Sequence, residues 1–260
     1  MTRDDAGVEA AARPRSTATL VGLGVLAAVL VLALLALGTW QVERRAWKLD
    51  LIERVDQRVA AAPVAPPGPA DWPGISAAAD EYRHVGVAGT FLNDRETQVF
   101  ASTDLGTGYW VVTPLRAADG TVVLVNRGFV PTEKRDPATR ATGEIAGPVT
   151  VTGLLRITEP KGGFLRANDP AAERWYSRDV AAIAAARGLA DAAPYFIDAD
   201  ATPNPGGLPV GGLTVIAFPN NHLVYAVTWY GLAVLLGWAV LHIGRGEWRI
   251  RHRASPSSPA

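Results

Sequence analysis

A histidine, a tyrosine and a tryptophan lie at helical spacing in the run Asn-Asn-His-Leu-Val-Tyr-Ala-Val-Thr-Trp-Tyr-Gly, which covers residues 220–231. Tyr225 follows His222 by three residues and Trp229 follows it by seven, so a helix that begins at His222 places all three rings along one face. Neutral imidazole is the commonest metal ligand among side chains and is an axial ligand of haem iron. The three residues are therefore a candidate cofactor-binding set, with His222 as the candidate ligand of the iron.

A second interpretation of His222 stays open. It could cap the helix and anchor it at lipid headgroups, while Asn220 and Asn221 satisfy the free backbone amides. His242 lies twenty residues further along, which is ~30 Å at helical rise, so one haem cannot be ligated by both histidines. Arg127 and Arg178 are candidates to meet the propionates of such a ligand.

The rest of the chain offers little catalytic chemistry. None of the four histidines, at positions 84, 222, 242 and 252, has a second metal ligand at helical or hairpin spacing. The absence of cysteine, with Met1 as the one methionine, excludes disulfides and thiolate or thioether metal sites. No phosphate-binding loop, nucleophile elbow or carboxylate pair is apparent. The sequence favours a protein that is not an enzyme, and an extracytoplasmic hydrolase is the enzymatic alternative.

Two apolar runs must position the candidate site. The first covers residues 20–38 and has no charged side chain, and the second covers residues 223–243. Each is long enough to cross a hydrocarbon core of ~30 Å as a helix, which predicts transmembrane helices at 17–39 and 222–243. Buried helices of a soluble protein are the alternative, and the first run could also be a signal peptide. Typical signal cores of ~7–15 residues are shorter, which favours an anchor.

Positive charge is distributed unequally around the second run. Four arginines follow it, at positions 245, 249, 251 and 253, whereas no Lys or Arg lies between Arg187 and the run. The positive-inside bias therefore predicts a cytoplasmic basic tail at 244–260 and a cytoplasmic N-terminus at 1–16. Residues 40–221 are then an extracytoplasmic domain on a multi-pass protein of a bacterial-type plasma membrane. Basic residues after the first run oppose this orientation, but acidic residues lie among them. The overall balance of 25 basic and 25 acidic residues argues against nucleic acid as a partner.

The domain between the runs changes character twice. Residues 40–62 have a helical apolar period and predict an amphipathic helix, which could rest on lipid or on its own sheet. Residues 63–80 are rich in proline and predict an extended linker. Residues 81–219 predict a β-rich core. Strands are expected at 82–91, 97–102, 109–115, 122–130, 149–157, 195–198 and 213–217, and a helix is expected at 177–187. The predicted fold is a membrane-anchored α+β protein, with two transmembrane helices flanking a small antiparallel barrel or sandwich that carries one or two helices.

Several short motifs follow one another along the chain. They are Gly-Thr-Trp-Gln-Val-Glu-Arg-Arg-Ala-Trp-Lys at 38–48, Glu-Tyr-Arg at 81–83, Gly-Thr-Phe at 89–91, Val-Asn-Arg-Gly-Phe-Val-Pro at 125–131, Asn-Asp-Pro at 168–170, Arg-Trp-Tyr-Ser-Arg-Asp at 174–179 and the Asn-Asn-His run at 220–231. Together they resemble the surfeit locus protein 1 family, membrane proteins that assist the assembly of haem-copper cytochrome c oxidase. The match departs from the family pattern at Phe129, where Trp is frequent, and at Tyr230, where Phe occurs.

The resemblance implies an assembly factor that handles or inserts haem a, with His222 at the position linked to haem binding in bacterial members. It implies as partners the oxidase subunits, above all the haem-bearing large subunit, together with membrane lipid and enzymes of haem a biosynthesis. The alternative is a scaffold that stabilises oxidase subunits without binding haem. The candidate partner-binding residues are Trp47, Arg127, Arg174, Trp175 and Arg178.

Overall fold

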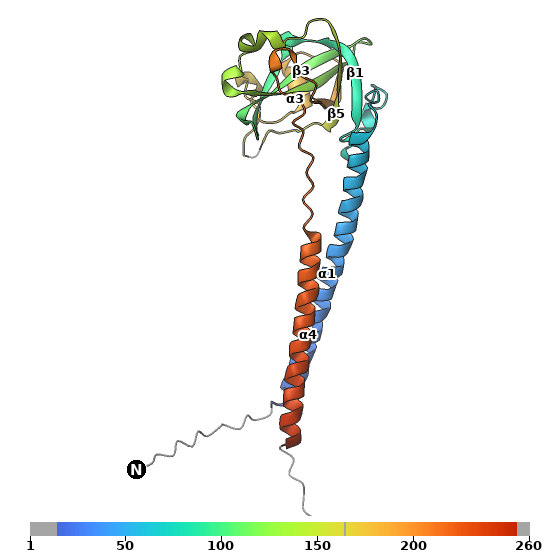
Figure 1. The fold of residues 1–260 in the computed structure, drawn as a ribbon, viewed down its shortest axis with the longest axis vertical. Coiled ribbons are helices and arrows are strands. Elements are labelled where there is room, and N and C mark those ends of the chain that lie inside the picture. The colour runs from blue at the N-terminus through green and yellow to red at the C-terminus, as the bar shows by residue number, and fades with distance from the viewer. Residues whose placement is uncertain (1–14, 164, 254–260) are drawn as a thin grey trace, which may run out of the picture. The chain divides into compact units, whose positions relative to one another are not determined.

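The computed structural model describes residues 15–163 and 165–253, which form two compact units (Figure 1). One unit comprises the chain up to Leu51 together with the chain from Phe218 onwards, and the other comprises Ile52–Ala217. Residues 1–14 and 254–260 of the predicted cytoplasmic ends lie outside the described residues. The fold class is confirmed in its main features, since two long apolar helices flank a barrel-like sheet.

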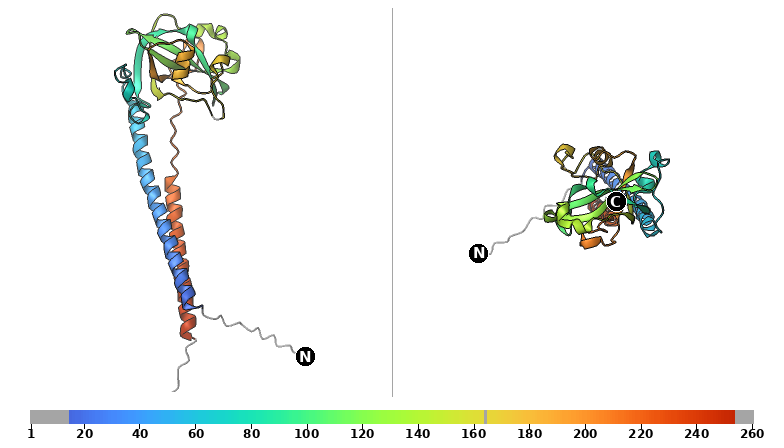
Figure 2. Two further views of the ribbon diagram at one scale, coloured as in Figure 1. Left: turned by 180° about the vertical axis from the view of Figure 1, so that it is seen from behind. Right: turned by 90° about the horizontal axis from the view of Figure 1, so that it is seen from above.

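The first unit contains one long helix and most of a second, and the two lie side by side in the upright views of Figure 1 and Figure 2. Helix α1 covers Thr17–Ala60 and helix α4 covers His222–Arg253. No proline occurs between residues 15 and 62, so the predicted amphipathic helix at 40–62 continues α1 without a break. Both helices are long and apolar enough to cross a membrane.

The contact between α1 and α4 depends on small residues. Gly38, Ala226 and Ala233 are buried. The ring of Tyr230 lies over Gly38 so closely that a Cβ added there would come within 2.7 Å of the ring. The Tyr230 hydroxyl also lies 3.1 Å from the hydroxyl of Thr39. Such close backbone approach and polar side-chain bonding are typical of helices that associate in a membrane.

A closed sheet forms the second unit. Its strands are β1 His84–Phe91, β2 Thr97–Thr103, β3 Gly106–Ala117, β4 Val122–Pro131, β5 Pro148–Ile157 and β6 Ala192–Ala199. The strand order is β1-β5-β6-β4-β3-β2, and β1 also pairs with the far end of β3. Five strands therefore close into a barrel, and β2 extends from β3 as a hairpin. Closure leaves the barrel itself without an unpaired edge.

Two details of the predicted sheet are wrong. The sheet is not wholly antiparallel, because β4 and β6 are parallel neighbours. The connection between them passes through β5 and the helix α3, Val180–Ala186, which gives the chain room to return in the same direction. Residues 213–217 do not form a strand. They are held instead by a side-chain bond from Thr214 to Asp198, 3.1 Å long, which needs no ladder of backbone bonds.

The proline-rich segment is packed on the barrel and is not a free spacer. It contains a short 3-10 helix at Trp72–Gly74 and a helical turn, α2, at Ala77–Asp80. The hydroxyl of Tyr195 donates to the carbonyl oxygen of Pro67 over 2.7 Å, and the indole of Trp72 donates to the same oxygen over 3.1 Å. Because Pro67 accepts from two aromatic side chains, the extended backbone of this segment is fixed to the core.

Strands β4 and β6 are covered on both faces. Val123, Val125 and Ile197 belong to the apolar cluster inside the barrel. Leu124 and Phe196 belong to a second cluster, which lies outside the barrel under α3. Side chains alternate across a strand, so consecutive apolar residues serve the two clusters in turn. This explains why both strands have long apolar runs without polar alternation.

Candidate functional site

His222 is the first residue of α4, and its imidazole is bound to a residue of α1. Its Nδ1 lies 2.7 Å from Oε1 of Gln41. An amide oxygen can only accept a hydrogen bond, so Nδ1 of His222 is the donor in this contact. The other ring nitrogen, Nε2, has no hydrogen-bond partner in the described part of the chain. The imidazole therefore has a free lone pair of the kind that binds a metal ion.

Tyr225 and Trp229 follow His222 on the same helix, as their spacing predicts. The Tyr225 side chain is exposed, and that of Trp229 is half-buried. The indole nitrogen of Trp229 is buried and has no acceptor among the described residues. A buried N–H without a partner costs free energy, so this group is suited to donate to a bound molecule. The chemistry of these residues fits a haem, with one free imidazole nitrogen and one unpaired indole N–H.

No contact among the described residues supports a capping role for Asn220. The side-chain oxygen of Asn220 is buried and has no hydrogen-bond partner in the described residues. The backbone amide of Tyr225 bonds to the carbonyl oxygen of Asn221, which is an ordinary helical contact. The imidazole of His222 bonds to Gln41 instead of to the amides of its own helix. His222 thus connects two helices and does not cap one.

Among the candidate partner-binding residues, Trp47 and Arg174 are exposed. The guanidinium carbon of Arg44 lies 4.7 Å from the ring centroid of Trp47, which leaves the other face of the indole free of that contact. Arg174 donates to Asp169 over 2.6 Å. An exposed ion pair of this kind contributes little to stability, so it does not hold Arg174 back from a partner. Trp47 and Arg174 are therefore both accessible to a partner protein.

Arg127 and Trp175 are buried, and the prediction that they contact a partner or ligand is corrected. Arg127 is 2% exposed and donates to the carbonyl oxygen of Gly143 and to Asn204. Burial lowers the pKa of Arg127. Trp175 is 2% exposed and packs in the cluster under α3. Both residues stabilise the barrel, because the protein's own groups already surround their side chains.

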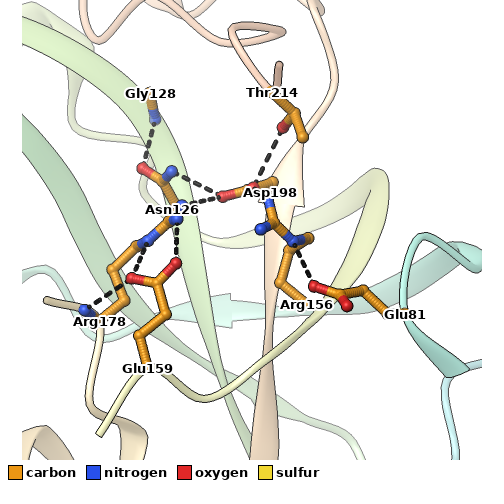
Figure 3. A network of polar contacts seen from close by, with 8 residues as sticks. All are labelled: Glu81, Asn126, Gly128, Arg156, Glu159, Arg178, Asp198 and Thr214. Carbon is orange, nitrogen blue, oxygen red and sulfur yellow. Dashed lines mark hydrogen bonds and ion pairs between the residues drawn. The ribbon is translucent and has the colours of Figure 1, made fainter. Parts of the chain in front are cut away.

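Arg178 belongs to a network of polar side chains around Asp198 (Figure 3). Asp198 is buried, and its Oδ1 accepts from Asn126 over 2.7 Å and from Arg178 over 2.9 Å. Its Oδ2 accepts from Arg156 over 2.8 Å and from Thr214 over 3.1 Å. The donors come from β4, from β5, from the residue before Asp179, the N-cap of α3, and from the segment after β6. One carboxylate thus connects several elements at one place on the barrel.

The charges in this network stabilise one another. Glu159 accepts from Nε and Nη2 of Arg178 over 3.0 and 2.5 Å. Burial alone would raise the pKa of Glu159, but the bonds and charge of Arg178 outweigh it and lower the pKa. Burial would lower the pKa of Arg178, but Asp198 and Glu159 outweigh it and raise the pKa. Glu159 and Arg178 are therefore both charged at neutral pH. Each nitrogen of the Arg178 guanidinium already donates to a carboxylate, so the group is not free for a propionate.

A cavity of about 220 Å³ adjoins this network and is lined by Trp110, Asn126, Arg156, Arg178, Asp198 and Leu213, among others. Gly128 lines it too, with φ of +130°, and a Cβ there would lie 2.1 Å from the carbonyl oxygen of Val210. This explains the glycine of the Asn-Arg-Gly motif, since no other residue allows this approach. The polar side chains around the cavity are bonded to one another. The Asn-Arg-Gly motif therefore has a structural role here.

Gln41 and Asp198 are the residues of these sites that the sequence analysis missed. Gln41 is the first strongly polar residue after an apolar run, which is a signal for a functional group in the membrane interface. Asp198 is the last but one residue of the buried apolar strand β6, and a buried carboxylate requires partners. No group of three or more His, Asp or Glu residues that could hold a metal ion occurs among the described residues.

Comparison with known proteins gives one consistent result. The model of the SURF1 family matches residues 28–234. Surfeit locus protein 1 of Homo sapiens is 41% identical over 214 residues, which cover 76% of this chain and 69% of the human protein. A SURF1-like protein of Monosiga brevicollis is 40% identical over 236 residues, which cover 85% of this chain and 87% of that protein. Surfeit locus protein 1 of Xenopus tropicalis is 36% identical over 248 residues, covering 89% of this chain and 78% of the relative. The chain belongs to the SURF1 family.

Proposed function

We propose that this protein is a membrane-anchored assembly factor for haem-copper cytochrome c oxidase and that it holds haem a through His222. The observation that carries the proposal is the imidazole of His222, whose Nδ1 is bonded to Gln41 while Nε2 keeps a free lone pair. Membership of the SURF1 family supports the role in oxidase assembly. In this role the protein is not an enzyme, because it passes on a cofactor without changing it.

His222 and the residues around it would each have a different role in binding haem. His222 supplies the ligand nitrogen, Tyr225 presents an exposed ring next to it, and Trp229 supplies a buried N–H that lacks an acceptor. Haem a supplies the iron and the broad apolar ring system. His222 would hold such a haem through the one imidazole nitrogen that has no partner in the described chain.

We place the site at the outer face of a bacterial-type plasma membrane. The arginines that follow the apolar part of α4, at 245, 249, 251 and 253, support a cytoplasmic C-terminal end. Two spanning helices then put residues 40–221 outside and both termini inside. In this orientation the barrel lies on the side from which oxidase subunits, lipid headgroups and enzymes of haem a biosynthesis can be contacted.

A scaffold that stabilises oxidase subunits without haem is the second candidate, and a face of the barrel favours it. The guanidinium of Arg166 lies 5.6 Å from the ring centroid of Phe100 and 5.3 Å from that of Tyr176. Arg135 lies 4.6 Å from the ring centroid of Tyr109. Arginine and tyrosine are enriched among the residues that dominate protein interfaces. A partner subunit could therefore bind this face without any role of His222.

The two candidates are separated by one comparison. The full chain and its His222→Ala variant are purified in detergent from cells that make haem a, and haem per protein is measured by the Soret band and by pigment extraction. We expect His222→Ala to lose most of the haem, because the variant lacks the imidazole nitrogen that would bind the iron. Tyr176→Ala, a change on the barrel, is the control and retains the haem. Haem in neither chain, with oxidase subunits still co-purifying, would favour the scaffold. Equal haem in both chains would remove the ligand role of His222.

A further inference from the structure

We infer that Gln41 is a positioning residue that selects the tautomer of His222 and so keeps Nε2 available to a metal. The role of the site in haem binding rests on the proposed function, but the tautomer is a property of the protein alone. Gln41 lies on α1 and His222 on α4, 181 residues apart in sequence. The orientation of the candidate ligand thus depends on a residue of the other helix.

The geometry determines which nitrogen carries the proton. The Gln41 oxygen faces Nδ1 at 2.7 Å, and an amide oxygen accepts but cannot donate. A neutral imidazole has one N–H, so placing it on Nδ1 leaves Nε2 as an acceptor. The opposite amide orientation would direct the Gln41 NH₂ at Nδ1 and would require the proton on Nε2. In that tautomer Nε2 could not bind iron.

Burial gives this single hydrogen bond its influence. Gln41 is 9% exposed, so water competes poorly for its amide oxygen. A hydrogen bond in a medium of low dielectric is electrostatically stronger than the same bond in water. Partners of this kind fix the tautomer and ring orientation of metal-binding histidines, and their loss typically lowers metal affinity by ~10–100-fold. Gln41 is therefore expected to affect Nε2 of His222, the nitrogen that would bind the iron, without itself contacting the haem.

Nuclear magnetic resonance of the full chain in detergent tests the tautomer in the absence of haem. Nitrogen-labelled histidine gives signals from only four residues, and His222→Ala identifies the signal of interest. In alkaline solution, where imidazole is neutral, we expect the parent chain to show a proton on Nδ1. Gln41→Leu should give a mixture of the two tautomers, and Gln41→Glu, which keeps an acceptor oxygen, should restore the Nδ1 proton.

Thr39→Val is the matched control. It removes a neighbouring bond between the same two helices, the contact of Thr39 with Tyr230, and leaves Gln41 in place. We expect this variant to keep the parent tautomer. A proton on Nε2 in the parent chain, or the same tautomer in the parent chain and Gln41→Leu, would overturn the inference. Elution volume and helical content confirm that each variant is folded, so a change in tautomer reports the side chain.

Haem titration then tests the consequence. We expect Gln41→Leu to bind haem about tenfold more weakly than the parent chain. Gln41→Glu should retain affinity and raise the iron–imidazole stretching frequency in the resonance Raman spectrum, because a carboxylate draws more strongly on the Nδ1 proton. If the tautomer follows Gln41 as expected but neither parent nor variant binds haem, the tautomer inference holds and the proposed haem function fails. If haem binds and Gln41→Leu has the parent affinity and Raman band, the positioning role is overturned.

Discussion

A single buried carboxylate, Asp198, holds four donors from different parts of the barrel (Figure 3). Two of these donors are the guanidinium groups of Arg156 and Arg178, whose charges it helps to balance. Glu159 and Glu81 supply further negative charge at the outer side of the same arginines. A buried charge that loses its partner is costly, because nothing replaces the water it gave up on folding.

We expect Asp198→Asn to destabilise the barrel by about 3 kcal/mol, since it leaves two arginines facing a neutral amide that also brings its own donors. Urea unfolding of the full chain in detergent, followed by tryptophan fluorescence, measures the effect. Asp104→Asn is the matched control, because Asp104 is exposed in the turn between β2 and β3. Equal unfolding midpoints for the parent chain and Asp198→Asn would show that the network adds no net stability.

The candidate site was only partly predictable from residue types. The spacing of His222, Tyr225 and Trp229 was visible because they lie on one helix, where sequence separation fixes which residues share a face. The bond to Gln41 was not, because it joins residues 181 positions apart. The sequence predicts Trp175 as a partner contact, but the packing of β2 against α3 buries it.

At the scale of elements, local sequence patterns predict where the strands lie better than they predict which strands pair with one another. The alternation of apolar residues and the turn signals such as Asp119-Gly120 depend on adjacent residues, so β1 to β5 are found close to the predicted ranges. The parallel pairing of β4 with β6 depends on closure of the whole barrel. Residues 213–217 have a strand-like composition, but they do not pair with a strand. Thr214 is instead hydrogen-bonded to the side chain of Asp198.

The pairing of α1 with α4 gives a prediction of its own. A Cβ at Gly38 would overlap the ring of Tyr230, whereas Gly22 on the same helix has open space. Gly38→Val should therefore displace Tyr230 and break its contact with Thr39, at a cost of about 1–3 kcal/mol for overpacking. Melting of the full chain in detergent by circular dichroism measures this cost, and the His222 tautomer signal reports whether the bond to Gln41 is lost.

Gly22→Val is the matched control for this prediction and should melt like the parent chain. The pair of variants separates a local clash from the general effect of a valine in an apolar helix. An unchanged melting curve and an unchanged His222 signal in Gly38→Val would mean that the Tyr230 contact does not hold the helices together.

At the scale of the whole molecule, the two units have opposite surfaces. The outward side chains of α1 and α4 are largely apolar, as in Val21, Leu32 and Val234, which are 60%, 66% and 71% exposed. Continuous apolar faces of this length are typical of helices that lie in hydrocarbon. The barrel instead buries its apolar residues in two clusters and exposes polar ones. These surfaces support a division between a part that is solvated by lipid and a part that is solvated by water.

The membrane orientation can be tested cleanly because the chain has no cysteine. Single cysteines are introduced at three exposed positions, Ser16→Cys before α1, Asp104→Cys in the barrel and Gly246→Cys near the end of α4. With a maleimide that cannot cross the membrane, we expect intact spheroplasts to label only Asp104→Cys, because the arginines at the end of α4 favour the cytoplasmic side. All three should label after lysis, which controls for accessibility. Labelling of Ser16→Cys and Gly246→Cys but not Asp104→Cys in intact spheroplasts would reverse the orientation and put His222 at the inner face of the membrane.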